Sequence, residues 1–147
     1  MACGKIKKLG GKYAEDIGFI EKICFSDPWS ISMIEAGMAS GSSIFYGSFC
    51  DDRLIGYISA LYTDEFCEIL NLAVLPQYRG MGRAKELIGK IYSDCLKKKI
   101  KKIFLEVRES ADAYFLYKNE GFSEYSRRKD YYKNPKEDAI LMMKEVL

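Results

Sequence analysis

The sequence predicts a single α/β domain over residues 1–147, in which helices flank one mixed sheet. Segments with apolar residues at helical spacing alternate with short β-branched and aromatic runs, and no repeat or Pro/Gly/Ser-rich linker divides the chain. With 147 residues and 48% hydrophobic content, the chain can build one core but not two independent domains. We therefore expect helices and strands in the order α-α-β-β-β-α-β-α-β-β.

Two helices are predicted near the start of the chain. The first spans residues 12–25 and ends before the Asp27-Pro28 pair. Its apolar positions at helical spacing are Tyr13, Ile17, Ile20 and Cys24. The second spans residues 31–38, because Ser32 and Glu35 have the spacing of a capping box.

An antiparallel meander and a crossover helix are predicted in the middle of the chain. Strands are expected over residues 43–50, 54–61 and 66–75, and a long helix over residues 82–97. One side of this helix is apolar and carries Ala84, Leu87, Ile88, Ile91 and Leu96. The next strand, residues 103–107, should be parallel to the strand before the helix.

The last third of the chain is expected to hold a helix over residues 111–119 and strands over residues 122–132 and 138–146. The strand over residues 103–107 reads Ile-Phe-Leu-Glu-Val, so Glu106 interrupts an apolar run. A single carboxylate in such a strand is a candidate functional group.

Composition excludes several kinds of chemistry. The chain has no histidine, which removes Ser-His and Cys-His nucleophiles and histidine-ligated metals, and we expect no metal site. The net charge of +2 and the absence of a recognition motif argue against direct nucleic-acid binding. No stretch approaches the ~18 apolar residues that span a bilayer, so no membrane association is expected. Five cysteines without a CxxC pair or a secretory leader predict reduced thiols, mostly core filler, in a cytoplasmic protein.

A glycine-containing loop at the start of the long helix has the properties of a phosphate-binding site. Gly80 and Gly82 allow the backbone to approach a bulky anion, and the N–H groups of the first helical turn point at it. Arg79 and Arg83 stand beside these glycines. The loop has neither the dinucleotide-binding nor the Walker spacing, which argues against those ligands.

Gln77-x-x-Gly80-x-Gly82 resembles the Q/R-x-x-G-x-G/A signature of the GNAT N-acetyltransferases, whose loop grips the pyrophosphate of acetyl-CoA. Further matching segments are Phe25-x-x-Pro28-Trp29-Ser30, Leu105-Glu106-Val107-Arg108, Ala113-x-x-Leu116-Tyr117 and Arg128-x-x-Tyr131-Tyr132. Together they resemble the ribosomal-protein-alanine N-acetyltransferase (RimI-type) branch of that family.

This resemblance implies a fold, a reaction and a set of site residues. The fold would have a central mixed sheet of six to seven strands flanked by helices. The reaction would transfer acetyl from acetyl-CoA to the α-amino group of a protein N-terminus, such as that of a ribosomal protein. Glu106 would accept a proton, and Tyr117 would donate one. The residues implied to contact the cofactor are Leu72, Ala73, Val74, Tyr78, Arg79, Gly80, Met81, Gly82 and Arg83, with Ser110 where the family has an asparagine.

Two other functions remain open from the residues alone. The first is acetylation of a small amine such as a polyamine or an aminoglycoside, which the net negative charge of the first half of the chain would attract. The second is a non-catalytic acyl-CoA sensor, for which the Ser110 departure is an argument. A monomer or weak dimer is expected.

Overall fold

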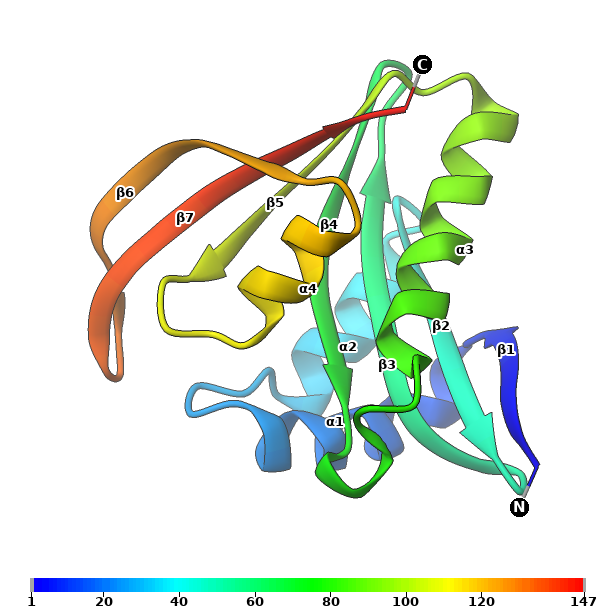
Figure 1. Ribbon diagram of the computed structural model, residues 1–147. Helices are drawn as coiled ribbons and strands as arrows, with labels where there is room; N and C mark the ends of the chain where they lie inside the picture. The colour runs from blue at the N-terminus through cyan, green and yellow to red at the C-terminus, as the bar shows by residue number, and fades with distance from the viewer. Residues whose placement is uncertain (1, 147) are drawn as a thin grey trace.

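The computed structural model describes residues 2–146, which form one seven-stranded mixed sheet flanked by helices (Figure 1). The strands are β1 (Cys3–Lys8), β2 (Ser43–Cys50), β3 (Arg53–Tyr62), β4 (Phe66–Val74), β5 (Lys102–Arg108), β6 (Ser123–Lys133) and β7 (Lys136–Glu145). The helices are α1 (Ala14–Cys24), α2 (Ile31–Ala39), α3 (Arg83–Lys98) and α4 (Ala113–Asn119), with 3₁₀ turns η1 (Gly11–Tyr13) and η2 (Pro76–Tyr78). The strand order is β1-β2-β3-β4-β5-β7-β6. The predicted mixed α/β fold is confirmed.

Strand β1 was not predicted. Its sequence, Cys-Gly-Lys-Ile-Lys-Lys, is half lysine, and such a composition is tolerated at the edge of a sheet, where β1 pairs only with β2. Cys3 of β1 lies opposite Cys50 of β2, and the two form a disulfide. The prediction of reduced thiols was therefore wrong for this pair. Cys67 and Cys95 are free and fully buried, as expected of core filler.

Two details of the predicted helices also differ. Helix α2 is capped by Ser30, whose hydroxyl accepts a hydrogen bond from the Met33 amide (3.1 Å), so the capping box at Ser32 was wrong. Ser30 follows Pro28-Trp29 with extended backbone, which is the geometry that an N-cap needs. Leu96 of α3 is 42% exposed, and Cys95 takes the core position instead.

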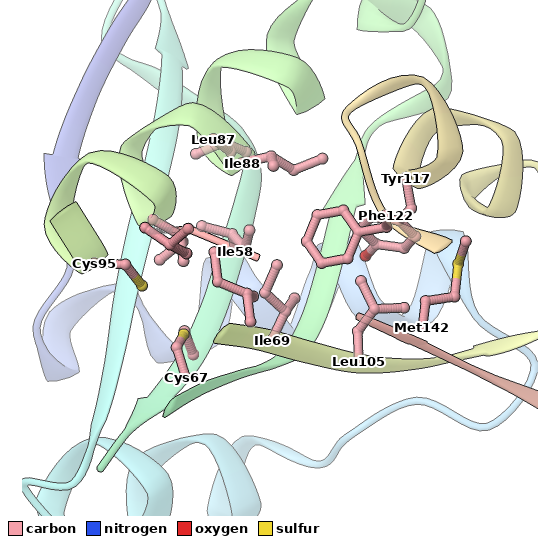
Figure 2. Close-up of a cluster of buried hydrophobic side chains, with 14 of the residues drawn as sticks. Ile58, Cys67, Ile69, Leu87, Ile88, Cys95, Leu105, Tyr117, Phe122 and Met142 are labelled. Atoms are coloured by element: carbon pink, nitrogen blue, oxygen red, sulfur yellow. The ribbon is translucent and has the colours of Figure 1, made fainter. Parts of the chain in front are cut away.

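Hydrophobic clusters lie on both faces of the sheet. On one face, α3 and α4 pack over β3, β4 and β5, and Figure 2 shows Leu87 and Ile88 of α3 above Ile69 and Leu105 of the sheet. On the other face, α1 and α2 cover β2 and β3. Within residues 2–146, no helix combines the length and the apolar composition that crossing a membrane requires.

Strands β4 and β5 are parallel, as predicted for a crossover, but they pair only over a short stretch. Phe66–Ile69 pairs with Lys102–Leu105, after which β4 continues beside β3 and β5 continues beside β7. The β3–β4 register shifts between Ser59 and Ala60, which leaves Leu70 as an extra residue and bends β4. Figure 1 shows the two strands leaving a common end and diverging, which opens a wedge in the sheet.

A buried carboxylate ties β4 to the first helix beside this wedge. Glu21 of α1 has no exposed surface and accepts hydrogen bonds from the Tyr57 hydroxyl (2.5 Å) and the Asn71 amide (2.8 Å). It also accepts one from the Trp29 N–H (2.8 Å), in the loop between α1 and α2. Glu21 therefore fixes that loop and the bent part of β4 relative to each other. The burial of Glu21 was not predicted, because a glutamate on a helix is usually solvated.

The burial of Glu21 should make the stability of the fold depend on pH. Burial raises its pKa above the ordinary value, against the opposing hydrogen bonds from Tyr57 and Trp29. Because the folded state holds this proton more tightly than the unfolded chain, the contribution of Glu21 to stability is fully present below a pH of about 4.3. It is then lost as the pH rises through the raised pKa. The free energy of unfolding of the wild type, relative to Glu21→Gln, should therefore fall as the pH increases.

Urea unfolding of both proteins across a pH series measures this difference. Glu15→Gln, at an exposed position of the same helix, is the matched control and should show no comparable trend. A wild-type advantage that is constant or grows with pH would contradict the assignment.

Candidate active site

The wedge between β4 and β5 exposes a strand edge that has lost its partner. Beyond Ile69, one side of β4 pairs with β3 while the side toward β5 has no ladder. Leu72 is half-buried against the α3 core, and Ala73 and Val74 are buried. The Val74 carbonyl is already engaged, because it accepts a hydrogen bond from the Arg79 Nε (2.8 Å). This edge can offer backbone groups to an extended chain lying in the wedge.

The loop after β4 ends in a helix N-terminus with free amides. Gly80 and Gly82 have positive φ values of 78° and 81°, and Gly82 is the N-cap of α3. The amide of Glu86 makes the first α-helical bond, to the Gly82 carbonyl (3.1 Å), so the three preceding helical amides have no intrahelical partner. A Cβ built on either glycine meets no atom within 4 Å. The loop is open and electropositive, as a diphosphate requires.

The predicted signature spans η2 and the loop before α3. Gln77 lies in η2, and Gly82 is the N-cap of α3. The amides of Ala84 and Lys85 are also free in the first turn of α3, and the predicted contact residues did not include them. The small side chain of Ala84 in the first turn was the available signal.

The two arginines of the loop make contacts within the protein. Besides the Val74 carbonyl, Arg79 contacts the Cys24 sulfur (3.5 Å). Arg83 donates to the Met81 carbonyl (2.9 Å) and pairs with Glu86 (3.0 Å). Both guanidinium groups are therefore hydrogen-bonded within the protein in this structure. Met81 is 42% exposed, and Tyr78 is half-buried against the α1 side of the core.

Glu106 lies on β5 at the point where β5 has parted from β4. Its side chain is 29% exposed, and its Oε1 is 3.4 Å from the Nε of Arg128. It opens into a hollow of about 310 Å³ whose lining also includes Phe66, Glu68, Phe104, Leu105, Tyr125, Arg128 and Leu141. Burial and the charge of Glu106 raise the pKa of Glu68. Two carboxylates thus share one guanidinium in this hollow.

Tyr117 comes from α4 and belongs to the core on the opposite face of the sheet. It is 5% exposed and packs edge-on against Phe122 (5.6 Å between ring centroids), as Figure 2 shows. Burial, and secondarily the charge of Tyr132, raises the pKa of the Tyr117 phenol, so the phenol holds its proton at neutral pH. Burial and then Glu106 raise the pKa of Tyr132 to about 12. Tyr132 is therefore within electrostatic range of both predicted proton-transfer residues.

Ser110 is directed toward the hairpin of β6 and β7. Its hydroxyl and its amide both donate to the Glu137 carboxylate, at 3.0 and 3.1 Å. The same carboxylate accepts from Arg108 (3.0 Å), which also donates to the Asn134 and Pro135 carbonyls. A hydrogen bond from Ser110 to a cofactor would have to compete with Glu137.

The hairpin and the loop after α1 are joined beside the site. The Ser26 hydroxyl donates to the Asn134 carbonyl (2.5 Å), and the Arg108 guanidinium lies 4.3 Å from the centre of the Tyr132 ring. The Ser26 bond joins the β6–β7 hairpin to the loop after α1, whose Trp29 amide is held by Glu21. The Arg108 contact joins the hairpin to β5.

Comparison with known proteins identifies similar chains. Residues 14–122 match the acetyltransferase (GNAT) family. The [ribosomal protein bS18]-alanine N-acetyltransferase of Haemophilus influenzae is 37% identical over 95 residues, which cover 63% of this chain and 65% of that protein, just under two thirds of its length. The corresponding enzyme of Escherichia coli (strain K12) is 32% identical over 130 residues, which cover 84% of each chain.

Solved structures share the fold. The crystal structure of the ribosomal-protein-S18-alanine N-acetyltransferase of Escherichia coli superposes with a TM-score of 0.89, at 23% identity over 97% of this chain and 93% of that one. Naa50 of Arabidopsis thaliana, in complex with the bisubstrate analogue CoA-Ac-MVNAL, gives a TM-score of 0.84 at 21% identity over 95% and 97%.

Proposed function

The chain belongs to the acetyltransferase (GNAT) family, and from this membership we propose that it acetylates the α-amino group of a protein N-terminus, that of a ribosomal protein in the first instance. The observation that supports this proposal best is the wedge between β4 and β5. The free amides of the first turn of α3 lie at one end of the wedge, and the Glu106 carboxylate is on β5, which borders it. The named relatives support the choice of acceptor.

The residues around the wedge suit acetyl-CoA. The first-turn amides of α3, with those of the Gly80–Gly82 loop, would hold the pyrophosphate, and the unpaired edge of β4 at Leu72 and Ala73 would align the pantetheine arm. When bound, acetyl-CoA supplies the thioester that a neutral amine attacks directly. The buried neighbours of the wedge would exclude water from that thioester.

Glu106 and Tyr117 would move the protons. An amine is nucleophilic only when neutral, and in a chain without histidine Glu106 is the carboxylate at the wedge that would accept its proton. The Tyr117 hydroxyl, which stays protonated at neutral pH, would donate a proton to the departing thiolate. Arg128, 3.4 Å from Glu106, would hold the carboxylate in place between turnovers.

Acetylation of a small amine is a second candidate. Glu68 and Glu106 both line the hollow with only Arg128 opposite them, an arrangement that attracts cations of any size. The named relatives favour a protein acceptor, because they are N-acetyltransferases of a ribosomal protein. We propose a monomer or weak dimer acting in the cytoplasm, where ribosomal proteins are made.

Removing either proton-transfer group should slow turnover without unfolding the protein. Glu106→Gln and Tyr117→Phe should each lower the rate of acetyl transfer by ~10²–10⁴-fold, because each keeps the side-chain shape and removes only the acid–base function. Release of the CoA thiol in the presence of an N-terminal peptide measures the rate, and a 42-Da mass increase on that peptide identifies the product.

Matched controls are available just after β5 and on α4. Glu109→Gln, on an exposed glutamate paired with Arg127, and Tyr114→Phe, one helical turn before Tyr117, should retain wild-type rates. Near-wild-type turnover of Glu106→Gln and Tyr117→Phe would refute the assigned roles. A mass increase found only on polyamines or aminoglycosides would refute the protein acceptor.

Substitution in the loop should weaken cofactor binding selectively. Gly82→Val places a β-branched side chain at φ 81°, where such residues are strained, and it shifts the first-turn amides. The dissociation constant for CoA, measured by calorimetry, should rise at least about tenfold, which corresponds to the loss of one good charge-assisted hydrogen bond. Gly89→Ala in the middle of α3, where a Cβ meets no atom within 4 Å, should leave it unchanged. An unaltered CoA affinity in Gly82→Val would place the diphosphate elsewhere.

A further inference from the structure

A row of aromatic rings crosses the open face of the sheet next to Glu106. Phe66 of β4 packs edge-on against Phe104 of β5 (5.7 Å between centroids), and Phe104 packs edge-on against Tyr125 of β6 (5.9 Å). Phe66 is 41% exposed and Tyr125 is 52% exposed. Three strands thus contribute one ring each to an apolar surface that solvent reaches.

This aromatic row is continuous with the candidate active site. All three rings line the hollow of about 310 Å³ that contains Glu106. Leu141 of β7, which pairs with Glu106 across the strands, lies on the same face and completes the floor. The charged groups of the hollow, Glu68, Glu106 and Arg128, lie together beside the rings.

We propose that the aromatic row is a specificity subsite that receives a bulky apolar side chain, preferably aromatic, from the first residues of the acceptor. The proposal rests on the proposed function, because it takes the acceptor amine to lie at Glu106. Exposed ring faces and edges are suited to a further aromatic ring, since edge-to-face contacts are favourable beyond the area they bury.

The spacing along β5 fits a peptide. Phe104 and Glu106 are two residues apart and point to the same face, which separates them by about 6.6 Å along the strand. In an extended peptide whose amine contacts Glu106, a side chain at the second or third position reaches that distance. The ring row is therefore within reach of the acceptor's own first residues.

The charges make the subsite selective. Glu68 and Glu106 face one guanidinium, and burial together with the Glu106 charge already raises the pKa of Glu68. An acidic side chain on the acceptor would add a third negative charge beside partly desolvated carboxylates, which is unfavourable. The subsite should accept apolar side chains and reject acidic ones.

A peptide series on the full-length protein tests this inference. Peptides beginning with alanine and sharing one tail carry Phe, Ala or Glu at position two, and a second set carries them at position three. We expect kcat/KM to be about tenfold higher for Phe than for Ala at one of these positions, the range typical of one filled apolar pocket, and lower for Glu than for Ala.

Substitutions in the aromatic row test whether it causes the preference for Phe over Ala in the acceptor peptide. Phe66→Ala and Tyr125→Ala should each bring the Phe-to-Ala ratio of kcat/KM to within about twofold. Phe115→Ala, at a 65% exposed aromatic of α4, should leave the ratio unchanged, and circular dichroism verifies the fold of each variant.

The outcomes distinguish failure of the subsite from failure of the proposed function. Acetylation of the peptides with no Phe preference, or with a preference that survives both ring substitutions, overturns the subsite and leaves N-terminal acetylation intact. Acetylation of spermidine and of none of the peptides overturns the proposed function, and the subsite with it.

Discussion

The site depends on where the pairing of β4 and β5 stops. Four residue pairs, Phe66–Ile69 with Lys102–Leu105, join these parallel strands, and beyond them each strand keeps only its outer neighbour. A sheet that stayed closed would bury these backbone groups in its own ladder. Because the ladder ends early, the edge of β4 is available to a ligand, and the start of α3 opens at the same end of the molecule.

The bend that keeps the wedge open is stabilised from the other side of the sheet. Leu70 is the extra residue in β4, and the next residue, Asn71, is hydrogen-bonded to the buried Glu21. A fully buried carboxylate is costly unless its hydrogen bonds are satisfied, and three donors from separate segments meet it here. Glu21 thereby couples the bend of β4 to the position of the α1–α2 loop. The strand proposed to align the cofactor is thus fixed by the same group that fixes this loop.

Local patterns sufficed for most of the fold, and long-range contacts account for what they missed. Helical spacing and the glycines of the loop are patterns of neighbouring residues. They therefore predicted α1, α3 and the loop before α3. Strand β1 depends on pairing with β2 and on the Cys3–Cys50 disulfide. Neither contact can be predicted from a lysine-rich segment alone. Ser30 and Ser32 are the same residue type, so both are candidates for the N-cap of α2. Only the extended backbone after Pro28 makes Ser30 the cap. The Glu21 contacts and the aromatic row join residues that are far apart in the sequence, so no local pattern contains them.

The wedge also explains how a proton acceptor and a proton donor on opposite faces of a sheet could serve one reaction. Side chains alternate along β5, so Glu106 faces the open side while Leu105 and Val107 join the core that contains Tyr117. In a closed sheet the backbone layer would separate the two groups. Where β4 and β5 part, a thioester lying in the plane of the sheet would be reachable from both faces. An amine arriving from the Glu106 side and a thiolate protonated from the Tyr117 side would then exchange protons with different groups. The proposed acceptor would then need to approach only one face, the one that carries Glu106 and the aromatic row.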